Sequence, residues 1–418
     1  MSTQPTRRLV GSVAFAAALS LGLAACGGGG NSGDATATGG SGGSGPVTIE
    51  VWDYLGQGVS DTAMKKVVAE FEAKNADIKV KRTSFAFADL SKSIVQGGVA
   101  GSVPDVAIVD VVDNQNFAAL GLLGDLGDDV KATADQFHPG PWSSTEYDGK
   151  SFGLPLNSNN LALYYNKAMF TEAKVTPPAT WTDLKTTAKA LTTPAHSGLA
   201  ISAVKSEQGT FQYLPFLWQT GGDLNTFETD GATSLAYLKG LIDDGSMSSA
   251  VANYTQEDAR TQFVTGKTAM MINGPWELQN LKDAAGLEFG VAPLPKDKAA
   301  ATGLGGENAV TFAAAKQPEA AKKFVQFLTS TEGAQIYCDE SGQLSARKDL
   351  AGKLKLSSDP DMQVFEKQLE TAHARAYGGK YTEISAAVQE ALQRALTGAA
   401  TPEVAAKEAA GKITPLLG

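Results

Sequence analysis

The chain has 418 residues, of which 43% are hydrophobic and 19% charged, so it can bury a large core and is unlike a disordered tail or a coiled-coil rod. At about 150 residues per domain, this length predicts two globular units. The formal charge of −10 becomes −12 without residues 1–25, which contain Arg7, Arg8 and no acidic residue. This acidic balance argues against a nucleic-acid or polybasic membrane role. Two cysteines and three histidines argue against a disulfide framework and a zinc finger.

The N-terminus has the layout of an export signal. Arg7 and Arg8 precede an apolar stretch from Leu9 to Ala25 that is too short for a comfortable membrane span. The stretch ends Leu-Ala-Ala-Cys at Cys26, which resembles the bacterial lipobox, where the cysteine becomes the lipid-modified first residue. We therefore predict a signal peptide over residues 1–25 and an extracytoplasmic protein, anchored by Cys26 to the outer face of the cell membrane. The paired arginines leave Sec and twin-arginine export open.

A polar tether follows the predicted lipidation site. Residues 27–45 contain ten glycines, three serines and no large apolar residue. They cannot pack into a core, and as a flexible coil they would span roughly 25 Å. Lipidation of Cys26 leaves Cys338 without a partner, and we assign this second cysteine no function because a lone thiol usually packs as a small apolar side chain.

From Pro46 onward the pattern alternates between strand and helix. Period-two alternation predicts strands, and apolar residues on one face predict helices. The expected order is a strand at 47–52, a helix around Met64, Val67, Val68 and Phe71, a strand at 78–82, a helix at 89–100 and a buried strand at 104–109. This order predicts an α/β sheet domain that is largely parallel.

Helix signals continue through the second half of the chain. Thr180 and Asp183 have the spacing of a capping box, with Trp181 packed behind them. Further helices are predicted at 318–328, at 384–396 and from Thr401-Pro402, where a cap residue precedes proline at the first helical position.

Several enzyme motifs match only in form. The Gly-rich matches to nucleophile-elbow and dinucleotide patterns lie in the tether, with no strand before them and no helix after them. Gly266-Lys267-Thr268 ends like a phosphate-binding loop, but Thr261 stands where the first glycine is required. Asp223 begins a calcium-like loop that fails four residues later. We expect no catalytic residues, no resident metal and no cofactor.

Aromatic and polar residues gather where strands end. Ligands of open α/β sheets bind beyond the carboxyl ends of the strands. Aromatic faces can stack on a sugar ring, while carboxylates and amides can bind its hydroxyls. Trp276 stands on a Gly-Pro turn and is expected to face a cleft, whereas Trp218 is expected in the core. The residues that follow strands are Trp52, Asp53 and Tyr54, then Asp110, Asp113 and Asn114, then Trp276 and Glu277.

Seven segments, in order along the chain, resemble the family 1 extracellular solute-binding proteins, relatives of the maltose-binding protein that deliver carbohydrates to ATP-driven importers. They are residues 100–106, 117–126, Tyr165-Asn166-Lys167, 178–184, 263–270, Asn273-Gly274-Pro275-Trp276 and 320–328. The resemblance implies a periplasmic-binding-protein-like α/β fold, with two lobes joined by a multi-strand hinge around a ligand cleft. It implies lobes at about 46–154 with 304–346 and 158–300 with 350–418, crossing near 154–157, 295–305 and 345–356. It also implies a non-catalytic, monomeric sugar receptor that serves ABC permease subunits.

The resemblance also points to site residues. The family's cleft tryptophan maps onto Trp276, its aromatic near a Pro-containing helix onto Phe211 or Tyr213, and its polar contacts onto Asp110, Asp113 or Asn114. The maltose-binding protein has a tryptophan and an arginine where this chain has Val109 and Asp113, which favours a mono- or small oligosaccharide over a long maltodextrin. The complete candidate set is Trp52, Asp53, Tyr54, Asp110, Asp113, Asn114, Asn157, Phe211, Tyr213, Trp276, Glu277, Glu307 and Tyr377.

Two alternatives remain. Another solute class, such as a polyamine, glycerol phosphate or a metal, would need paired acidic residues for a cation or clustered Arg and Lys for a phosphate. A secreted glycosidase would need a facing carboxylate pair such as Asp110 and Asp113. Residues three apart on one strand point to opposite faces, which argues against that pair.

Overall fold

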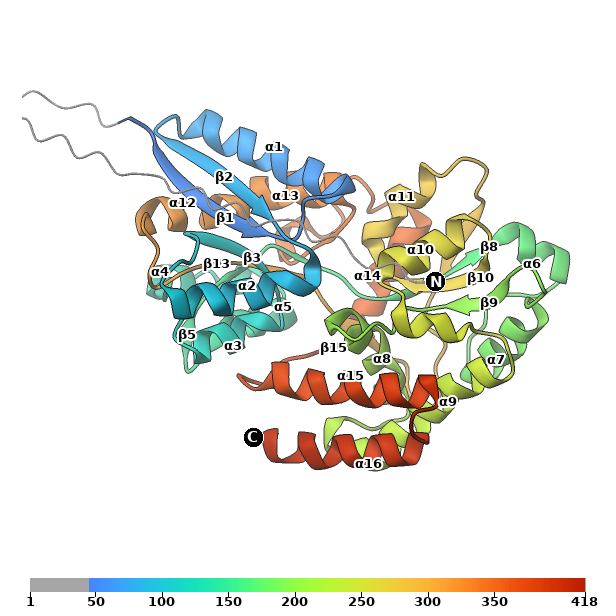
Figure 1. Ribbon diagram of the computed structural model, residues 1–418. Coiled ribbons are helices and arrows are strands. Elements are labelled where there is room, and N and C mark those ends of the chain that lie inside the picture. Colours follow the sequence, from blue (N-terminus) through green and yellow to red (C-terminus); the bar gives the residue numbers. More distant parts are fainter. Residues whose placement is uncertain (1–44, 418) are drawn as a thin grey trace, which may run out of the picture. The chain divides into compact units, whose positions relative to one another are not determined.

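Two mixed β-sheets organise the protein (Figure 1). The computed structural model describes residues 45–417. The predicted signal peptide, Cys26 and the tether up to residue 44 lie outside the described residues. In strand order, the first sheet contains β2 (Ile78–Ser84), β1 (Val47–Asp53), β3 (Val106–Asp110), β13 (Glu307–Thr311) and β6 (Leu154–Pro155). The second sheet contains β11 (Phe289–Ala292), β8 (Ala162–Asn166), β10 (Thr268–Asn273) and β9 (Ser197–Ala200).

The prediction of a largely parallel sheet holds for the three strands from which it was made, β2, β1 and β3, but not for the complete first sheet. Strand β1 pairs in parallel with β2 and β3, but β13 runs antiparallel to both β3 and β6. In the second sheet β8 is antiparallel to β10 and β11. The local pattern of the first hundred residues could not reveal this, because β13 reaches the first sheet only after the chain has passed through the second.

Helices cover both faces of the first sheet. Helices α1 (Gly58–Lys74), α12 (Pro318–Leu328) and α13 (Thr331–Ser341) pack on one face, and α2 (Phe87–Ala100) and α3 (Asp113–Ala119) pack on the other. Short helices α4 (Asp128–Lys131) and α5 (Pro139–Thr145) lie beside this sheet. Alternate residues of β3 point to the two cores: Val106 and Ile108 to one, Ala107 and Val109 to the other. This is why the strand is apolar throughout.

The second sheet is also buried on both faces. Its larger core is closed by α7 (Trp181–Ala190), α8 (Glu207–Gln219), α9 (Ala232–Asp243), α15 (Tyr381–Thr397) and α16 (Pro402–Ile413). Its other face packs against α10 (Gln256–Val264), α11 (Leu278–Lys282) and α14 (Pro360–Gln368). Helix α6 (Lys167–Ala173) packs beside β8 and β11. Helices α15 and α16 run side by side at the C-terminal end (Figure 1).

Most of the predicted helix signals are confirmed. Thr180 and Asp183 form the capping box, and Thr401 caps α16 with Pro402 in its first turn. Trp181 and Trp218 are buried, as is Cys338, whose thiol packs in the first core. In the described part of the chain, no helix is long and apolar enough to cross a bilayer.

Short strands join the two sheets. The chain passes from β6 through β7 (Asn157–Ser158) to β8, and returns from β11 through β12 (Thr302–Leu304) to β13. It leaves again after α13 through β14 (Leu344–Ser345). Strand β7 pairs with β14, and β12 pairs with β15 (Ala372–Ala374). These pairs bring Gln343 and Arg375, at the ends of β14 and β15, next to the edge of the first sheet.

Candidate ligand-binding cleft

A cleft of about 630 Å³ takes residues from both sheets and from the short strands between them. A volume of this size falls in the range of small-molecule sites. From the side of the first sheet come Tyr54, Phe85, Phe87, Asp110 and Glu307; from the side of the second come Glu207, Phe211, Arg260, Trp276 and Glu277; and from the connections come Gly305, Gly306, Gln343 and Arg375. Strands β1 and β3 both point their carboxyl ends toward this cleft.

Trp276 lines the cleft from a short helical turn, η5 (Pro275–Glu277), that directly follows β10. Its ring lies flat against Gly274, where an added Cβ would come within 1.9 Å of a ring atom. Only glycine therefore lets the indole take this position. Beside it, the buried carboxylate of Glu277 accepts from Arg260, N···O 3.2 Å, and from Asn280.

The aromatic groups of the opposite wall come from the loops after β1 and β2. Tyr54 packs edge-on against Phe87, with ring centroids 4.9 Å apart. Trp52, which precedes Asp53, packs against Phe85 in the hydrophobic cluster between β1 and α2, with ring centroids 5.0 Å apart and ring planes tilted by 53°. The cleft thus presents aromatic side chains from both sides, and Trp52 supports one of them from behind.

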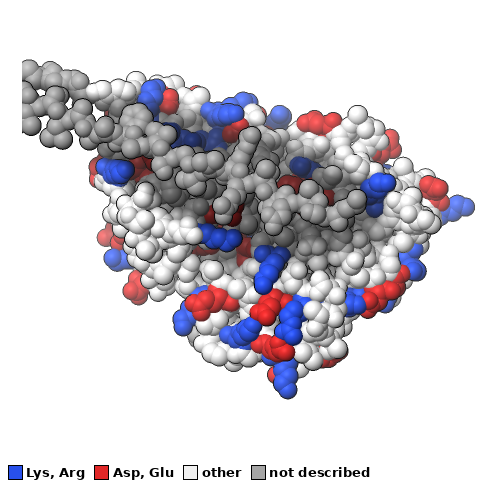
Figure 2. All heavy atoms as spheres, in the orientation of Figure 1, with Lys and Arg blue, Asp and Glu red and all other residues white. Residues whose placement is uncertain are grey.

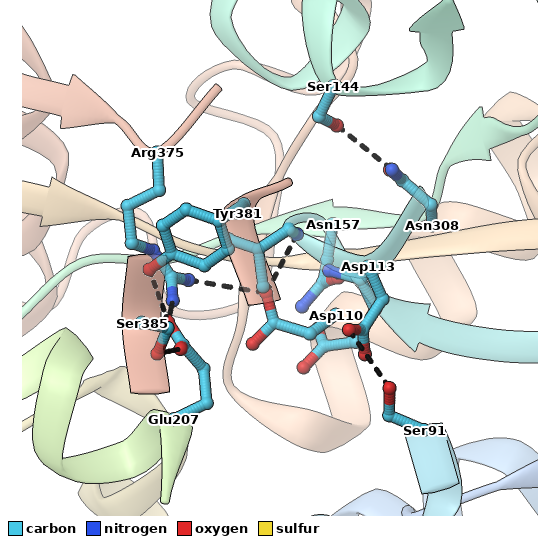
Figure 3. A network of polar contacts seen from close by, with 12 residues as sticks. Ser91, Asp110, Asp113, Ser144, Asn157, Glu207, Asn308, Arg375, Tyr381 and Ser385 are labelled. Atoms are coloured by element: carbon cyan, nitrogen blue, oxygen red, sulfur yellow. Dashed lines mark hydrogen bonds and ion pairs between the residues drawn. The ribbon is translucent and has the colours of Figure 1, made fainter. Parts of the chain in front are cut away.

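A buried guanidinium links the two sides (Figure 3). Arg375 is 3% exposed and pairs with Asp110 of β3, N···O 3.2 Å, and with Glu207 at the start of α8. Tyr381 and Ser385 of α15 also donate to Glu207. The flat guanidinium lies 4.3 Å from the ring centroid of Phe211. Within the described residues the Nε of Arg375 has no hydrogen-bond partner.

Glu307 is the first residue of β13 and stands directly opposite Asp110 in the antiparallel register. Like charges in such a pair repel each other. Tyr54 Oη donates to Glu307 Oε1 at 3.0 Å, and Asn157 Oδ1 accepts from the backbone N–H of Glu307. The other oxygen, Oε2, has no partner within the described chain. Burial, and secondarily the charge of Asp110, raises the pKa of Glu307 to about 7.

Asp113 corrects one argument made from the sequence. It is not on the strand of Asp110 but begins α3, so the two carboxyl groups lie near one another and not on opposite faces (Figure 3). Burial, followed by the charges of Asp110 and Glu207, raises the pKa of Asp113 to about 8. Ser91 Oγ donates to this carboxyl at 3.2 Å.

Six of the predicted residues line the cleft: Tyr54, Asp110, Phe211, Trp276, Glu277 and Glu307. Three others lie in the packed interior with partners of their own. Asp53 is fully buried and pairs with Arg82 at 2.8 Å, Asn114 donates to the Thr145 carbonyl, and Tyr213 shares a hydrogen bond with Ser234. For these three the structure favours packing roles over contact with a ligand.

The four remaining candidates do not line the cleft but lie next to other residues of the site. Asn157 supports the backbone of Glu307, Asp113 faces Asp110, and Trp52 backs Phe85. Tyr377 is half-buried against Trp218, whose indole N–H donates to the Tyr377 hydroxyl at 3.2 Å.

The polar residues of the cleft that sequence reasoning missed include Glu207, Arg260, Gln343 and Arg375. A signal existed for Glu207, because it is the one charged residue of α8 and stands at the start of the helix. No local signal marks Arg375, which follows a three-residue strand.

Charged side chains of both signs are interspersed on the visible face of the molecule (Figure 2). The cleft lining has more acidic than basic side chains: five carboxylates, from Asp110, Glu207, Glu257, Glu277 and Glu307, and three cations, from Lys205, Arg260 and Arg375. Among the described residues, no group of three or more His, Cys, Asp or Glu side chains has the arrangement of a metal site.

Comparison with known proteins gives a consistent set of relatives. The family model described as bacterial extracellular solute-binding protein matches residues 66–364. The maltodextrin-binding protein MdxE of Bacillus subtilis is 24% identical, with 94% of each chain covered. A maltooligosaccharide ABC transporter solute-binding lipoprotein of Streptococcus pneumoniae is 29% identical, over 68% of this chain and 69% of its own.

Solved structures match over most of the chain. An ABC transporter solute-binding protein from Thermotoga lettingae, bound to alpha-D-tagatose, is 30% identical with a TM-score of 0.82, covering 90% of this chain and 100% of that one. Maltose-bound MalE3 of T. maritima is 28% identical with a TM-score of 0.81, covering 89% and 100%. The periplasmic-binding-protein-like fold, with two α/β lobes and a cleft between them, is therefore confirmed.

Proposed function

The chain belongs to the family of bacterial extracellular solute-binding proteins, and on that premise we propose that it captures a mono- or small oligosaccharide in the cleft and delivers it to an ABC importer. One observation carries the proposal: aromatic rings from both sides of one cleft surround a set of buried polar groups. Rings supply the stacking faces and the polar groups the directed hydrogen bonds that a sugar needs. The relatives that bind tagatose and maltose support the same ligand class.

Capture works by closure. Residues 46–154 with 304–346 would form one lobe and residues 158–300 with 350–418 the other, joined by the strands between the sheets. A sugar stacked on Trp276 and bound by Tyr54 or Asp110 would touch both lobes at once. Because such contacts exist only when the lobes are close together, the ligand favours the closed state, which the permease then recognises.

Cys26 would carry the lipid that holds the mature protein at the outer face of the membrane, with residues 27–45 as the tether. The protein would act as a monomer beside its permease subunits. The lipoprotein name of the pneumococcal relative supports this placement.

Binding without catalysis is the activity we propose. A glycosidase needs two free carboxyl groups across the scissile bond. Here Asp110 is held by Arg375 and by the backbone N–H of Val112. The relatives are solute-binding proteins, which supports the same reading.

A thermal-shift screen against mono-, di- and trisaccharides tests the proposal, with polyamines and glycerol phosphate as controls. A bound sugar at 100 times its Kd should stabilise the protein by about 2.7 kcal/mol. Trp276→Ala should abolish the shift while Trp276→Phe keeps most of it. The proposal fails if no sugar gives a shift, or if Trp276→Ala responds like the natural protein.

A further inference from the structure

One buried carboxylate of the cleft lining forms no ion pair within the described residues. Glu277 pairs with Arg260, and Asp110 and Glu207 share Arg375. Glu307 is 7% exposed and makes no ion pair within the described residues. Its Oε1 accepts from Tyr54, its Oε2 is buried without a hydrogen-bond partner in the described chain, and the residue is part of the cleft lining. A buried acceptor without a donor costs about 1 to 3 kcal/mol, and more when it is charged.

Gln343 supplies a second unpartnered acceptor among the residues that line the cleft. Gln343 is 4% exposed and lines the same cleft, and its Oε1 also has no partner in the described chain. It immediately precedes β14, where Ser345 pairs with Asn157. Asn157 in turn accepts from the backbone of Glu307. The short strands thus bring two unmatched acceptors to one part of the wall.

We propose that the ligand is a carbohydrate that carries a protonated amine, and that this ammonium group binds at Glu307. The proposal rests on the proposed function and narrows its ligand class. An ammonium group has three donors and no acceptor, so it matches acceptors such as Glu307 Oε2 and Gln343 Oε1. It also adds positive charge beside Asp110, Glu207 and Glu307, three carboxylates near which Arg375 supplies one guanidinium. A neutral hydroxyl could donate to Oε2 but would leave the charge unbalanced.

The proton of Glu307 distinguishes an aminated ligand from a neutral one. Because the pKa of Glu307 is about 7, the free protein holds this proton about half of the time at pH 7. An ammonium ligand requires the ionised form, so binding should release about half a proton. Its affinity should rise about ninefold from pH 6 to pH 8, as the ionised fraction rises from about 0.1 to about 0.9.

Other titratable or charged groups surround Glu307. They are Asp110, Tyr54, Tyr337, Cys338 and Arg375. Burial raises the pKa values of Tyr54, Tyr337 and the Cys338 thiol, so these groups stay neutral between pH 6 and 8. Asp113, with a pKa of about 8, also titrates in this interval from its place beside Asp110. Glu307→Gln and Asp113→Asn therefore separate the two contributions.

Isothermal titration of the purified protein provides the test. The probes are glucose, 6-amino-6-deoxyglucose and 6-acetamido-6-deoxyglucose, with glucosamine and N-acetylglucosamine as a second series. An alkylamine at position 6, like a lysine amine, stays protonated through pH 8. We expect at least one amino sugar to bind tenfold or more tightly than its neutral counterparts, with proton release measured in buffers of different ionisation enthalpy.

Variants show whether Glu307 is responsible. Glu307→Gln should remove both the amine preference and the proton release, while Glu172→Gln, on the exposed surface of α6, removes the same charge and should change neither. Asp113→Asn should leave the amine preference in place. Unliganded melting curves establish that each variant is folded, and Glu307→Asp, which shortens the side chain and draws the carboxylate back from the ligand, should reduce the preference if Glu307→Gln does not fold.

The outcomes separate the inference from the proposed function. Binding of any neutral sugar as tightly as its amino form, with Glu307→Gln unchanged, overturns the inference and leaves the sugar receptor intact. Polyamine binding with no response to any sugar overturns both.

Discussion

Arg375 is predicted to be one of the most stabilising polar side chains of the cleft, and Arg375→Met tests this. The substitution keeps an unbranched side chain of similar length and removes the guanidinium that pairs with Asp110 and Glu207. Removing one partner of a buried ion pair costs about 3 to 5 kcal/mol, because the remaining charge is left without compensation. For a folded unit of this size, with about 2.1 cal/mol/K of unfolding entropy per residue, the melting temperature should fall by about 4 to 6 °C.

The pH dependence of this loss identifies its cause. Burial already raises the pKa of Glu207, with Arg375 acting against that rise. Without the guanidinium the pKa of Glu207 rises further. Above that pKa the folded protein contains a buried, uncompensated carboxylate and is less stable. As the pH falls, the carboxyl takes up a proton and the lost stability is regained. The difference in melting temperature between Arg375→Met and the natural protein should therefore shrink from pH 8 to pH 5. Scanning calorimetry across this range is the assay.

Arg82→Met is the matched control, since Arg82 forms a similar buried pair with Asp53 away from the cleft. It should destabilise the fold comparably but leave sugar affinity unchanged, whereas Arg375→Met should weaken both. A melting temperature unaffected by Arg375→Met would refute the assigned network, and a loss independent of pH would refute its electrostatic origin.

Three further predictions concern single positions. Gly274→Ala should displace the Trp276 ring and weaken sugar binding about 2- to 12-fold by titration, the equivalent of about 0.5 to 1.5 kcal/mol for one aromatic contact; unchanged affinity would show that the ring does not contact the ligand. Because the pKa of Glu307 is raised in the folded protein, the free energy of unfolding should fall as the pH rises from about 4 through 7. Glu307→Gln should lessen this fall, measured by urea unfolding at several pH values. The same pH dependence in the variant would contradict the burial of a charge at Glu307. Thr180→Ala removes one capping-box acceptor and should lower the free energy of unfolding by about 1 kcal/mol in the same assay, while Thr182→Ala, two residues later and exposed, should lower it much less.

Local chemistry explains which parts of the fold could be predicted. The capping box at Thr180 and the proline start of α16 depend on hydrogen bonds and backbone angles within a few residues. The apolar run of β3 follows from burial on two faces. The orientation of β13 could not be predicted in this way. It depends on the path of the preceding 150 or so residues, which build the second sheet before the chain returns to the first.

The same distinction separates the site residues that the local sequence could predict from those that it could not. Trp276 was predictable because the Gly-Pro turn that presents it lies next to it in the sequence. Asp53 and Tyr213 matched the same kind of pattern but are buried, because their partners Arg82 and Ser234 come from other segments. Arg375 and Glu207, 168 residues apart, meet only in the folded chain.

The sequence by itself therefore determined the alternation of strands and helices, the family and the aromatic residue on the Gly-Pro turn, since each is encoded by neighbouring residues. The tertiary structure alone decided which carboxylates share a guanidinium and which, such as Glu307, form no ion pair within the described residues. Charge compensation acts over a few ångströms of space irrespective of distance along the chain, so no local pattern could have revealed it.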